Sequence, residues 1–99
     1  MLYSDVQYTW TEEAFAALPP GVEPHQVMRM LQETKVLRIW YTSDVLAMFG
    51  RSPDGVDLVV FVSEDDHFGG VEAWLIEGAR PMFPGEVRRF RDLVGGTDG

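Results

Sequence analysis

Arginine is the residue type in this sequence that is best suited to bind a phosphate group. Arg51 follows a glycine at the end of an apolar segment, Arg80 ends a later segment, and Arg88, Arg89 and Arg91 cluster near the C-terminus. A guanidinium group donates two parallel hydrogen bonds to one phosphate and stays charged at physiological pH. These side chains are therefore candidate anion-binding groups. The alternative is that they are ordinary arginines on an exposed surface.

The two histidines carry the side chains that titrate closest to neutral pH. His67 ends the acidic segment Glu64-Asp65-Asp66-His67, where carboxylates favour the charged imidazole and raise its pKa. It is either an acid or base near neutrality or a polar loop residue, whereas His25 has no evident role. The three carboxylates are oxygen ligands of the kind that calcium prefers, but their spacing matches no calcium loop. We therefore predict a solvated turn, no metal site and no cofactor.

The charge of the chain is unevenly distributed. The net charge is -8, from 16 acidic and 8 basic residues, and four of the arginines lie within residues 80–91 with only Glu86 as an acidic neighbour. A protein that binds nucleic acid directly usually carries net positive charge. Direct DNA binding is therefore not expected, and RNA stays open as a partner through the basic segment. An acidic surface can instead engage basic proteins.

The absence of cysteine excludes disulfides, thiolate metal sites and a cysteine nucleophile. A disulfide-free domain of this size is typical of the reducing cytoplasm. Residues 1–10 lack the basic start and apolar run of a signal peptide. The longest apolar stretches, of which residues 58–62 are one, are far too short to cross a membrane. We expect a soluble cytoplasmic protein with no membrane partner.

The elements that position the candidate residues follow from the apolar pattern. Residues 6–10 are predicted to form a short strand. A first helix is expected to begin at the N-cap Thr11 and to end at Pro19-Pro20-Gly21, and a second helix is expected to begin at Pro24. Further strands are expected at 36–41, 45–49, 58–62 and 71–77, with a turn at 52–55 and a final helix from Pro84. Residues 58–62 are apolar at every position, which is typical of a central strand covered on both faces.

This order predicts an α+β fold, with helices on one face of an antiparallel sheet of three to five strands. Residues 1–94 form one domain, and the glycine-rich residues 95–99 form a flexible tail. Trp40, Tyr41, Phe61 and Trp74 are either core residues or an aromatic platform on which bases stack.

Short motifs follow one another in a characteristic order along residues 6–92. They are Tyr8-Thr9-Trp10-Thr11-Glu12-Glu13, then Gly21-Val22, Gly50-Arg51, Ala79-Arg80 and finally Glu86-Val87-Arg88-Arg89-Phe90. In the order and spacing of these motifs the sequence resembles the BrnT-like toxins of the RelE superfamily.

The resemblance implies a small ribonuclease that arrests translation and is held inactive by a cognate antitoxin protein. Metal-independent RNA cleavage needs a base, a cation at the phosphate and an acid. The candidates are Arg51 and Arg80 as catalytic cations, Arg88, Arg89 and Arg91 as RNA-binding residues, and His67 as acid or base. An oligomer is compatible with the sequence.

The sequence also departs from this family. Members usually carry a lysine in the first helix and a Lys-His pair before the Gly-Val, where this chain has Ala14 or a neighbour and Pro19-Pro20. The alternative function is therefore a non-catalytic acidic protein-interaction module on the same fold. Convergence of Arg51, Arg80 and Arg88 in space favours the toxin, and scatter of these residues favours the module.

Overall fold

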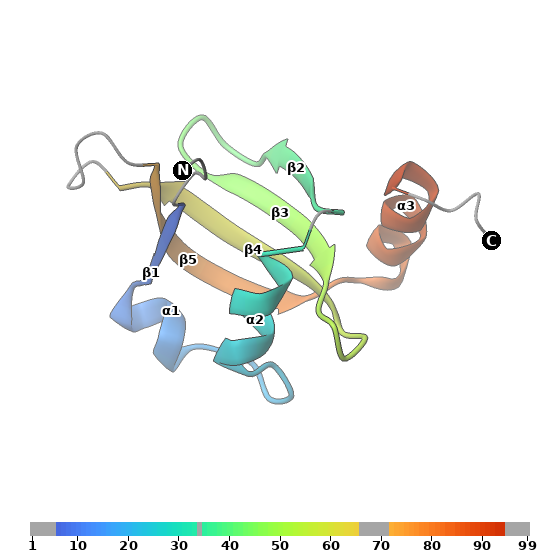
Figure 1. The fold of residues 1–99 in the computed structure, drawn as a ribbon, viewed down its shortest axis with the longest axis horizontal. Coiled ribbons are helices and arrows are strands. Elements are labelled where there is room, and N and C mark those ends of the chain that lie inside the picture. Colours follow the sequence, from blue (N-terminus) through green and yellow to red (C-terminus); the bar gives the residue numbers. More distant parts are fainter. Residues whose placement is uncertain (1–5, 34, 66–71, 95–99) are drawn as a thin grey trace, which may run out of the picture.

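A computed structural model describes residues 6–33, 35–65 and 72–94 of the chain. The elements along the chain are β1 (Gln7–Trp10), α1 (Glu12–Ala16), α2 (Pro24–Met30), β2 (Leu37–Trp40), β3 (Leu46–Arg51), β4 (Asp57–Glu64), β5 (Ala73–Pro81) and α3 (Pro84–Val94). Helices and strands are segregated along most of the chain, so the α+β class is confirmed (Figure 1).

The five strands form one sheet in the order β1-β5-β4-β3-β2. Strands β2 to β5 are an antiparallel meander, but β1 pairs with β5 in parallel. The expectation of a purely antiparallel sheet is therefore wrong. The meander leaves one edge of β5 free, and β1 can occupy it in parallel because helices and the rest of the sheet separate the two strands in sequence.

Strand β4 is the central strand, as its apolar sequence predicts. Leu58, Val59, Val60 and Val62 are fully buried, whereas Phe61 is only partly covered. Neighbouring side chains along a strand point to opposite faces, so these residues contribute to both cores of the molecule. The incomplete cover of Phe61 shows that part of one face is open.

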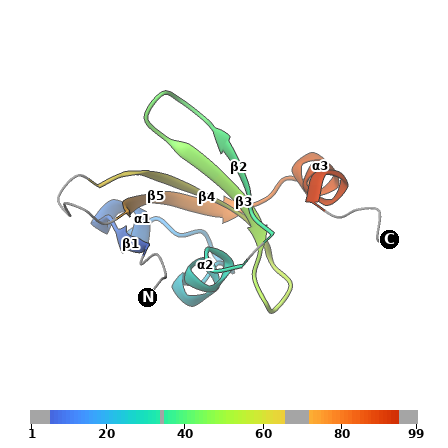
Figure 2. The same ribbon diagram turned by 45° about the horizontal axis from the view of Figure 1, so that its top comes forward.

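Two apolar clusters lie on opposite faces of the sheet. Val27 and Met30 of α2 pack with Met48 and Val60 in the larger cluster. Phe90 of α3 packs with residues on the alternate face, Ala47, Val59 and Met82. Helices thus lie on both faces, with α2 and α3 on different sides of the sheet (Figure 2). The expectation of helices on one face is wrong, because α3 carries its own apolar stripe to the side opposite α2.

Close approach of α2 to the sheet explains why a glycine lies within β3. The expected strand ends before Gly50, but the observed strand continues to Arg51. A Cβ atom at Gly50 would lie 2.6 Å from Sδ and 2.9 Å from Cγ of Met30. Because glycine has no side chain, the fully buried Met30 can lie against the strand at this point.

The β3–β4 turn is tied to the start of α2. Gly55 adopts a φ of 93°, which favours glycine, and its N–H donates to the carbonyl oxygen of Ser52 at 2.9 Å. The Gln26 side-chain amide donates to Asp54 at 2.9 Å, and the Ser52 hydroxyl also donates to Asp54. These bonds lower the pKa of the Asp54 carboxyl, the Ser52 bond contributing most.

The length of β5 and the exposure of Leu93 in α3 also differ from expectation. Strand β5 continues past residue 77 to Pro81, because a register shift at Phe61/Val62 keeps the pairing with β4 intact. Leu93, an apolar residue of α3 that a buried helix face would be expected to include, is 61% exposed. The expected tail at 95–99 lies outside the described residues, as does residue 71 at the expected start of the last strand.

Candidate functional site

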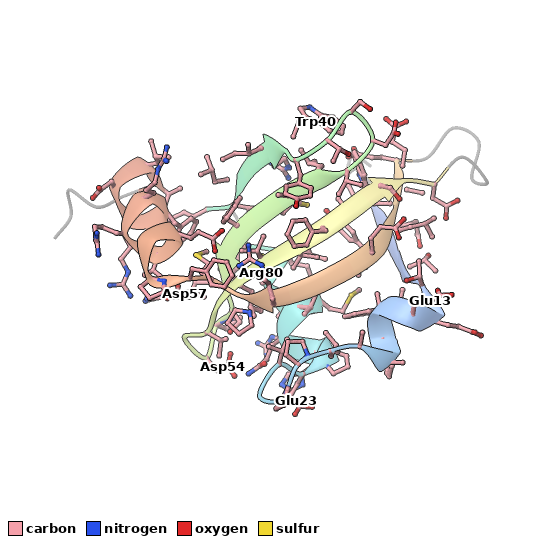
Figure 3. The ribbon with its side chains drawn as sticks, turned by 180° about the vertical axis from the view of Figure 1, so that it is seen from behind. Glu13, Glu23, Trp40, Asp54, Asp57 and Arg80 are labelled. Atoms are coloured by element: carbon pink, nitrogen blue, oxygen red, sulfur yellow. The ribbon has the colours of Figure 1, made fainter. Side chains whose placement is uncertain are left out.

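Arg51 and Arg80 project from the same face of the sheet. One cross-strand row contains Phe49, Val59 and Arg80. Arg51, two residues after Phe49 on β3, pairs with Asp57, two residues before Val59 on β4. Positions two residues apart on a strand share a face. The two candidate cations therefore lie on the face that α3 partly covers. Figure 3 labels Arg80 and Asp57, the partner of Arg51, on this face.

Arg80 is held by the start of α3. Its two terminal nitrogens donate to the two carboxylate oxygens of Glu86 at 2.8 and 2.9 Å, and one of them also donates to the Pro81 carbonyl at 3.0 Å. Glu86 in turn accepts the backbone N–H of Phe83 at 2.8 Å, which satisfies a donor at the helix N-terminus. The hydrogen bond from Arg80 lowers the pKa of the Glu86 carboxyl, and the same bond raises that of the Arg80 guanidinium.

Arg51 and Arg91 share one carboxylate. Nε of Arg51 donates to Asp57 at 2.9 Å, and a terminal nitrogen of Arg91 lies 3.7 Å from the other oxygen of Asp57. The side chain of Asp57 is 15% exposed, whereas those of Arg51 and Arg91 are 46% and 57% exposed. The hydrogen bond to Asp57 raises the pKa of Arg51. Asp57 thus joins the end of β3 to the last turn of α3.

The remaining basic residues of α3 face solvent. Arg88 and Arg89 are exposed, and no salt bridge to either occurs within the described part of the chain. Together with Arg51, Arg80 and Arg91 they form what we term the arginine surface. Its acidic residues are Asp57, Glu86 and Asp92, so five positive charges stand against three negative charges in a chain of net charge -8.

Aromatic rings adjoin Arg80 on the open part of this face. The guanidinium carbon lies 4.1 Å from the ring centroid of Phe83 and 5.7 Å from that of Phe61. Tyr41 packs edge-on against Phe61 with the ring centroids 5.2 Å apart. Tyr41 and Phe83 are 69% and 60% exposed, so the rings offer faces to solvent rather than completing a core. We term Tyr41, Phe61, Arg80 and Phe83 the aromatic platform.

The aromatic residues that the sequence grouped together divide between the two faces of the sheet. Tyr41 and Phe61 belong to the platform, while Trp40 and Trp74 line a cavity on the opposite face. Trp40 and Tyr41 are more than half exposed, so neither is a core residue. Neighbouring residues at the end of β2 point in opposite directions, which the sequence pattern alone did not resolve.

Sequence reasoning did not identify Glu86 and Asp57 as part of the site. Glu86 stands three residues after Phe83, the spacing of a capping box, but the serine or threonine that signals such a box is absent. Asp57 meets Arg51 only because a tight turn pairs β3 with β4. Both carboxylates neutralise guanidinium groups that the sequence suggested were available for phosphate.

The arrangement places a carboxylate and a guanidinium side by side, paired with each other. Arg80 would have to exchange a hydrogen bond to Glu86 for one to a phosphate, and the carboxylate so released would be the stronger base, because the bond from Arg80 is what lowers its pKa. The candidate acid or base His67 lies outside the described residues. Within residues 6–33, 35–65 and 72–94, no three acidic or histidine side chains gather as a metal site.

Comparisons with known proteins add no family to these observations. No protein-family model matches the chain, and no curated protein matches it. None of the helices in the described residues is both long and apolar enough to span a membrane.

Proposed function

We propose that the protein is a RelE/BrnT-like toxin of a toxin–antitoxin module that acts on RNA in the cytoplasm. One observation carries the proposal: Arg51, Arg80 and Arg91, far apart in sequence, lie around one end of one sheet face. The shared face of Arg51 and Arg80 supports the proposal, whereas Arg88 is exposed on α3 and forms no salt bridge within the described residues. The exposed rings of Tyr41 and Phe83 beside Arg80 offer stacking surfaces for bases.

The net charge of -8 is compatible with this proposal because the arginine surface is locally positive. At physiological ionic strength, charges more than about 8 Å apart in solvent are largely screened. A phosphate on the arginine surface therefore interacts mainly with its immediate neighbours. The distant carboxylates slow the encounter with RNA more than they weaken the bound state, and the affinity depends strongly on salt.

Glu86 and Arg80 have complementary roles in the proposed cleavage. A bound phosphate replaces Glu86 as partner of Arg80, which removes the hydrogen bonds that lower the pKa of the Glu86 carboxyl. Glu86 then takes the proton of a 2′-hydroxyl, the 2′ oxygen attacks the adjacent phosphorus, and the bond to the 5′ oxygen breaks. Arg80 stabilises the charge that builds on the phosphate, and the leaving 5′ oxygen takes up a proton. The Tyr41 hydroxyl is a candidate donor because Tyr41 packs against Phe61, whose ring lies beside the Arg80 guanidinium.

Growth under induced expression tests the toxin proposal. We expect the wild-type protein to slow growth, and Arg80→Ala and Arg51→Ala to relieve the effect at equal protein levels. Arg29→Ala is the matched control, because Arg29 is an exposed arginine on α2, across the sheet from Arg80. Unimpaired growth under strong expression of the wild-type protein would refute toxicity.

Binding to RNA tests the surface directly. In fluorescence anisotropy with a short single-stranded RNA, we expect Arg80→Ala to weaken binding about tenfold, the loss of one charged hydrogen-bonding group. Arg80→Lys should weaken it nearly as much, because lysine cannot donate two parallel hydrogen bonds. RNA affinity that is the same in Arg80→Ala and Arg29→Ala would show that the arginine surface is not the contact.

A second candidate function is the non-catalytic acidic interaction module. It is favoured by a specific observation: Arg51 and Arg80 are both neutralised by carboxylates within the chain. In this case Glu86 and Asp57 are structural, and the exposed rings contact a protein partner. The absence of salt-sensitive RNA binding, combined with retained binding to a basic protein expressed from the same operon, would select the module over the toxin.

A further inference from the structure

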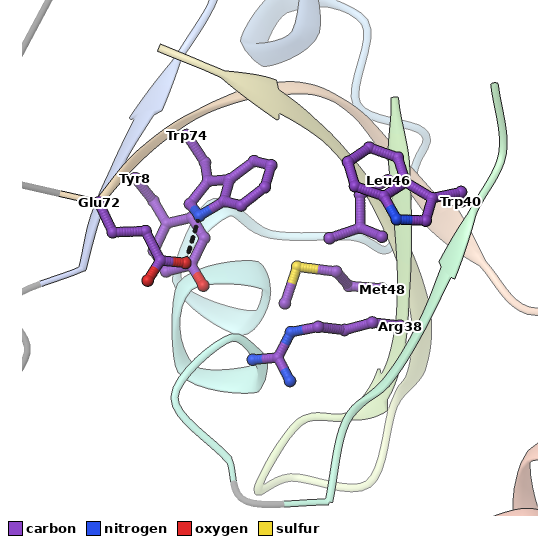
Figure 4. A pocket seen from close by; sticks show the side chains of 7 residues that line it. All are labelled: Tyr8, Arg38, Trp40, Leu46, Met48, Glu72 and Trp74. Atoms are coloured by element: carbon purple, nitrogen blue, oxygen red, sulfur yellow. Dashed lines mark hydrogen bonds between the residues drawn. The ribbon is translucent and has the colours of Figure 1, made fainter. Parts of the chain in front are cut away.

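A cavity on the face opposite the arginine surface has the features of a small-molecule site. Its volume is about 270 Å³, and it is lined by Tyr8, Arg38, Trp40, Leu46, Met48, Glu72 and Trp74. Arg38 and Trp40 enter from β2, while Tyr8, Glu72 and Trp74 come from the β1–β5 side (Figure 4). The buried side chains of Leu46 and Met48 lie between them as an apolar floor.

The register of the sheet separates this cavity from the proposed RNA contact. Arg38 pairs with Met48, which pairs with Val60, whereas Arg80 pairs with Val59. Val59 and Val60 point to opposite faces of β4. The cavity is thus independent of the arginine surface, and its function does not depend on the toxin proposal.

Arg38 differs from Arg51, Arg80 and Arg91 of the opposite face in that the described residues provide it with no carboxylate partner. Arg51, Arg80 and Arg91 all form salt bridges, but none involves Arg38 within the described part of the chain. Burial raises the pKa of the Tyr8 hydroxyl, and the Arg38 guanidinium opposes that shift. The phenol therefore stays protonated at neutral pH, and both groups can donate hydrogen bonds to an anion.

Glu72 fixes one wall of the cavity. Nε1 of Trp74 donates to Glu72 at 2.8 Å, which limits rotation of the indole ring (Figure 4). Trp40 supplies a second indole from the other side and is 57% exposed. Two indoles and one phenol around an apolar floor bind flat rings through stacking and apolar contact.

The charges of the lining decide between a cationic and an anionic ligand. Three aromatic rings with a carboxylate resemble a cage for an ammonium group. Glu72 keeps its negative charge, but one of its oxygens is already used by Trp74, which leaves it fewer acceptor sites for a cation. The guanidinium of Arg38 forms no salt bridge within the described residues and keeps its donors for a ligand. A cation would be repelled by Arg38 and would gain only the remaining oxygen of Glu72, whereas an anionic group gains two donors, Arg38 and Tyr8.

We propose that this cavity binds a flat aromatic ring that carries an anionic group, with the ring between Trp40 and Trp74 and the anion at Arg38. The volume lies just below the range of about 300–1,000 Å³ that is typical of small-molecule sites. It therefore suits one ring system with a short substituent. A purine nucleoside monophosphate and an aromatic carboxylic acid are the two sources of this chemistry.

Nuclear magnetic resonance of the three indole N–H groups tests the proposal on the whole chain. GMP, guanosine, phenylacetate and inorganic phosphate are titrated separately into the wild-type protein. We expect GMP or phenylacetate to shift the Trp40 and Trp74 signals in a saturable way, while Trp10, which does not line the cavity, stays unchanged. Guanosine should bind at least about tenfold more weakly than GMP, since it lacks the group that Arg38 binds.

Variants separate the role of Arg38 from a general effect on the fold. Arg38→Gln should weaken GMP or phenylacetate about tenfold and leave guanosine unchanged, and Trp40→Leu should weaken all ring-bearing ligands. Arg29→Gln and Arg80→Ala are controls that should bind as the wild type does. The proposal is overturned if no ring-bearing anion shifts Trp40 and Trp74 saturably, or if GMP and guanosine bind equally well.

Discussion

Adding one methyl group at Gly50 is expected to destabilise the protein through a clash with Met30. A Cβ atom there would lie 2.6 Å from Sδ and 2.9 Å from Cγ of Met30, and 3.4 Å from a methyl carbon of Val36. Ordinary contacts between non-bonded heavy atoms are about 3.5–4.0 Å. The side chain of Met30 must therefore move by about 1 Å, and it is fully buried among other core residues.

The change in the free energy of unfolding that Gly50→Ala causes is the difference of two opposing effects. Overpacking a core of this kind costs about 1–3 kcal/mol. Replacing glycine with alanine also restricts the unfolded chain, which stabilises by about 0.4–1 kcal/mol. We therefore expect Gly50→Ala to lower the free energy of unfolding by about 1–2 kcal/mol, the loss being limited by the flexibility of methionine.

Urea denaturation measures this loss as a shift of the midpoint by roughly 0.5–1 M, for a slope of about 2 kcal/mol per M. Gly78→Ala is the matched control within the same sheet, because the nearest atom to its added Cβ would lie at 4.0 Å. We expect that variant to be as stable as the wild type or slightly more so. A second background, Met30→Ala, removes the atoms with which the new methyl group collides.

In the Met30→Ala background, Gly50→Ala should be neutral or stabilising, so that the two substitutions couple by at least about 1 kcal/mol. Met30→Ala alone is expected to cost about 2–5 kcal/mol. Equal effects of Gly50→Ala in both backgrounds would refute the reasoning, because the clash with Met30 would then not be the cause.

Two further predictions concern the carboxylates of the arginine surface. The pKa of Glu86 is lowered in the folded state, so its contribution to stability is complete above about pH 4.3 and is lost as the pH falls through the lower folded-state value. Glu86→Gln should thus lower the melting temperature at pH 7, and the difference from wild type should shrink in acid; a constant difference would contradict the linkage. Asp57→Asn removes the carboxylate shared by Arg51 and Arg91, so under the toxin proposal we expect tighter RNA binding with a steeper salt dependence. Unchanged or weaker RNA binding by a folded Asp57→Asn protein would argue that these arginines do not contact RNA.

The apolar pattern was sufficient to predict most elements. The unbroken apolar run at 58–62 identified the central strand, because apolar residues at successive positions are typical of a strand with apolar cover on both faces. The cap at Thr11 and the proline at the start of α2 were read correctly from residue type, since the bonds they satisfy are local. The turn at 52–55 was likewise signalled by its serine, proline and glycine.

The pairing of strands could not be predicted in the same way. Which edge β1 occupies, and in which direction, depends on competition between distant segments for the free edge of β5. The face of the sheet on which α3 packs could not be predicted either. An apolar stripe shows that one side of a helix is buried, but not which face of the sheet buries it. Gly50 illustrates the same limit. A glycine at this position suggests the end of a strand, but the structure shows that glycine is needed there because Met30 lies close to the backbone.

The sequence by itself determined the α+β class, the central strand and the chemical nature of the candidate groups, because these depend on residue type and local periodicity. Only the tertiary structure decided which charges meet. It placed Arg51 and Arg80 on one face and provided each with a carboxylate, while it put Arg38 in an aromatic cavity where the described residues offer it no salt bridge. The physical reason is that hydrogen bonds and ion pairs act over a few ångströms, and those distances are set by strand register rather than by separation along the chain.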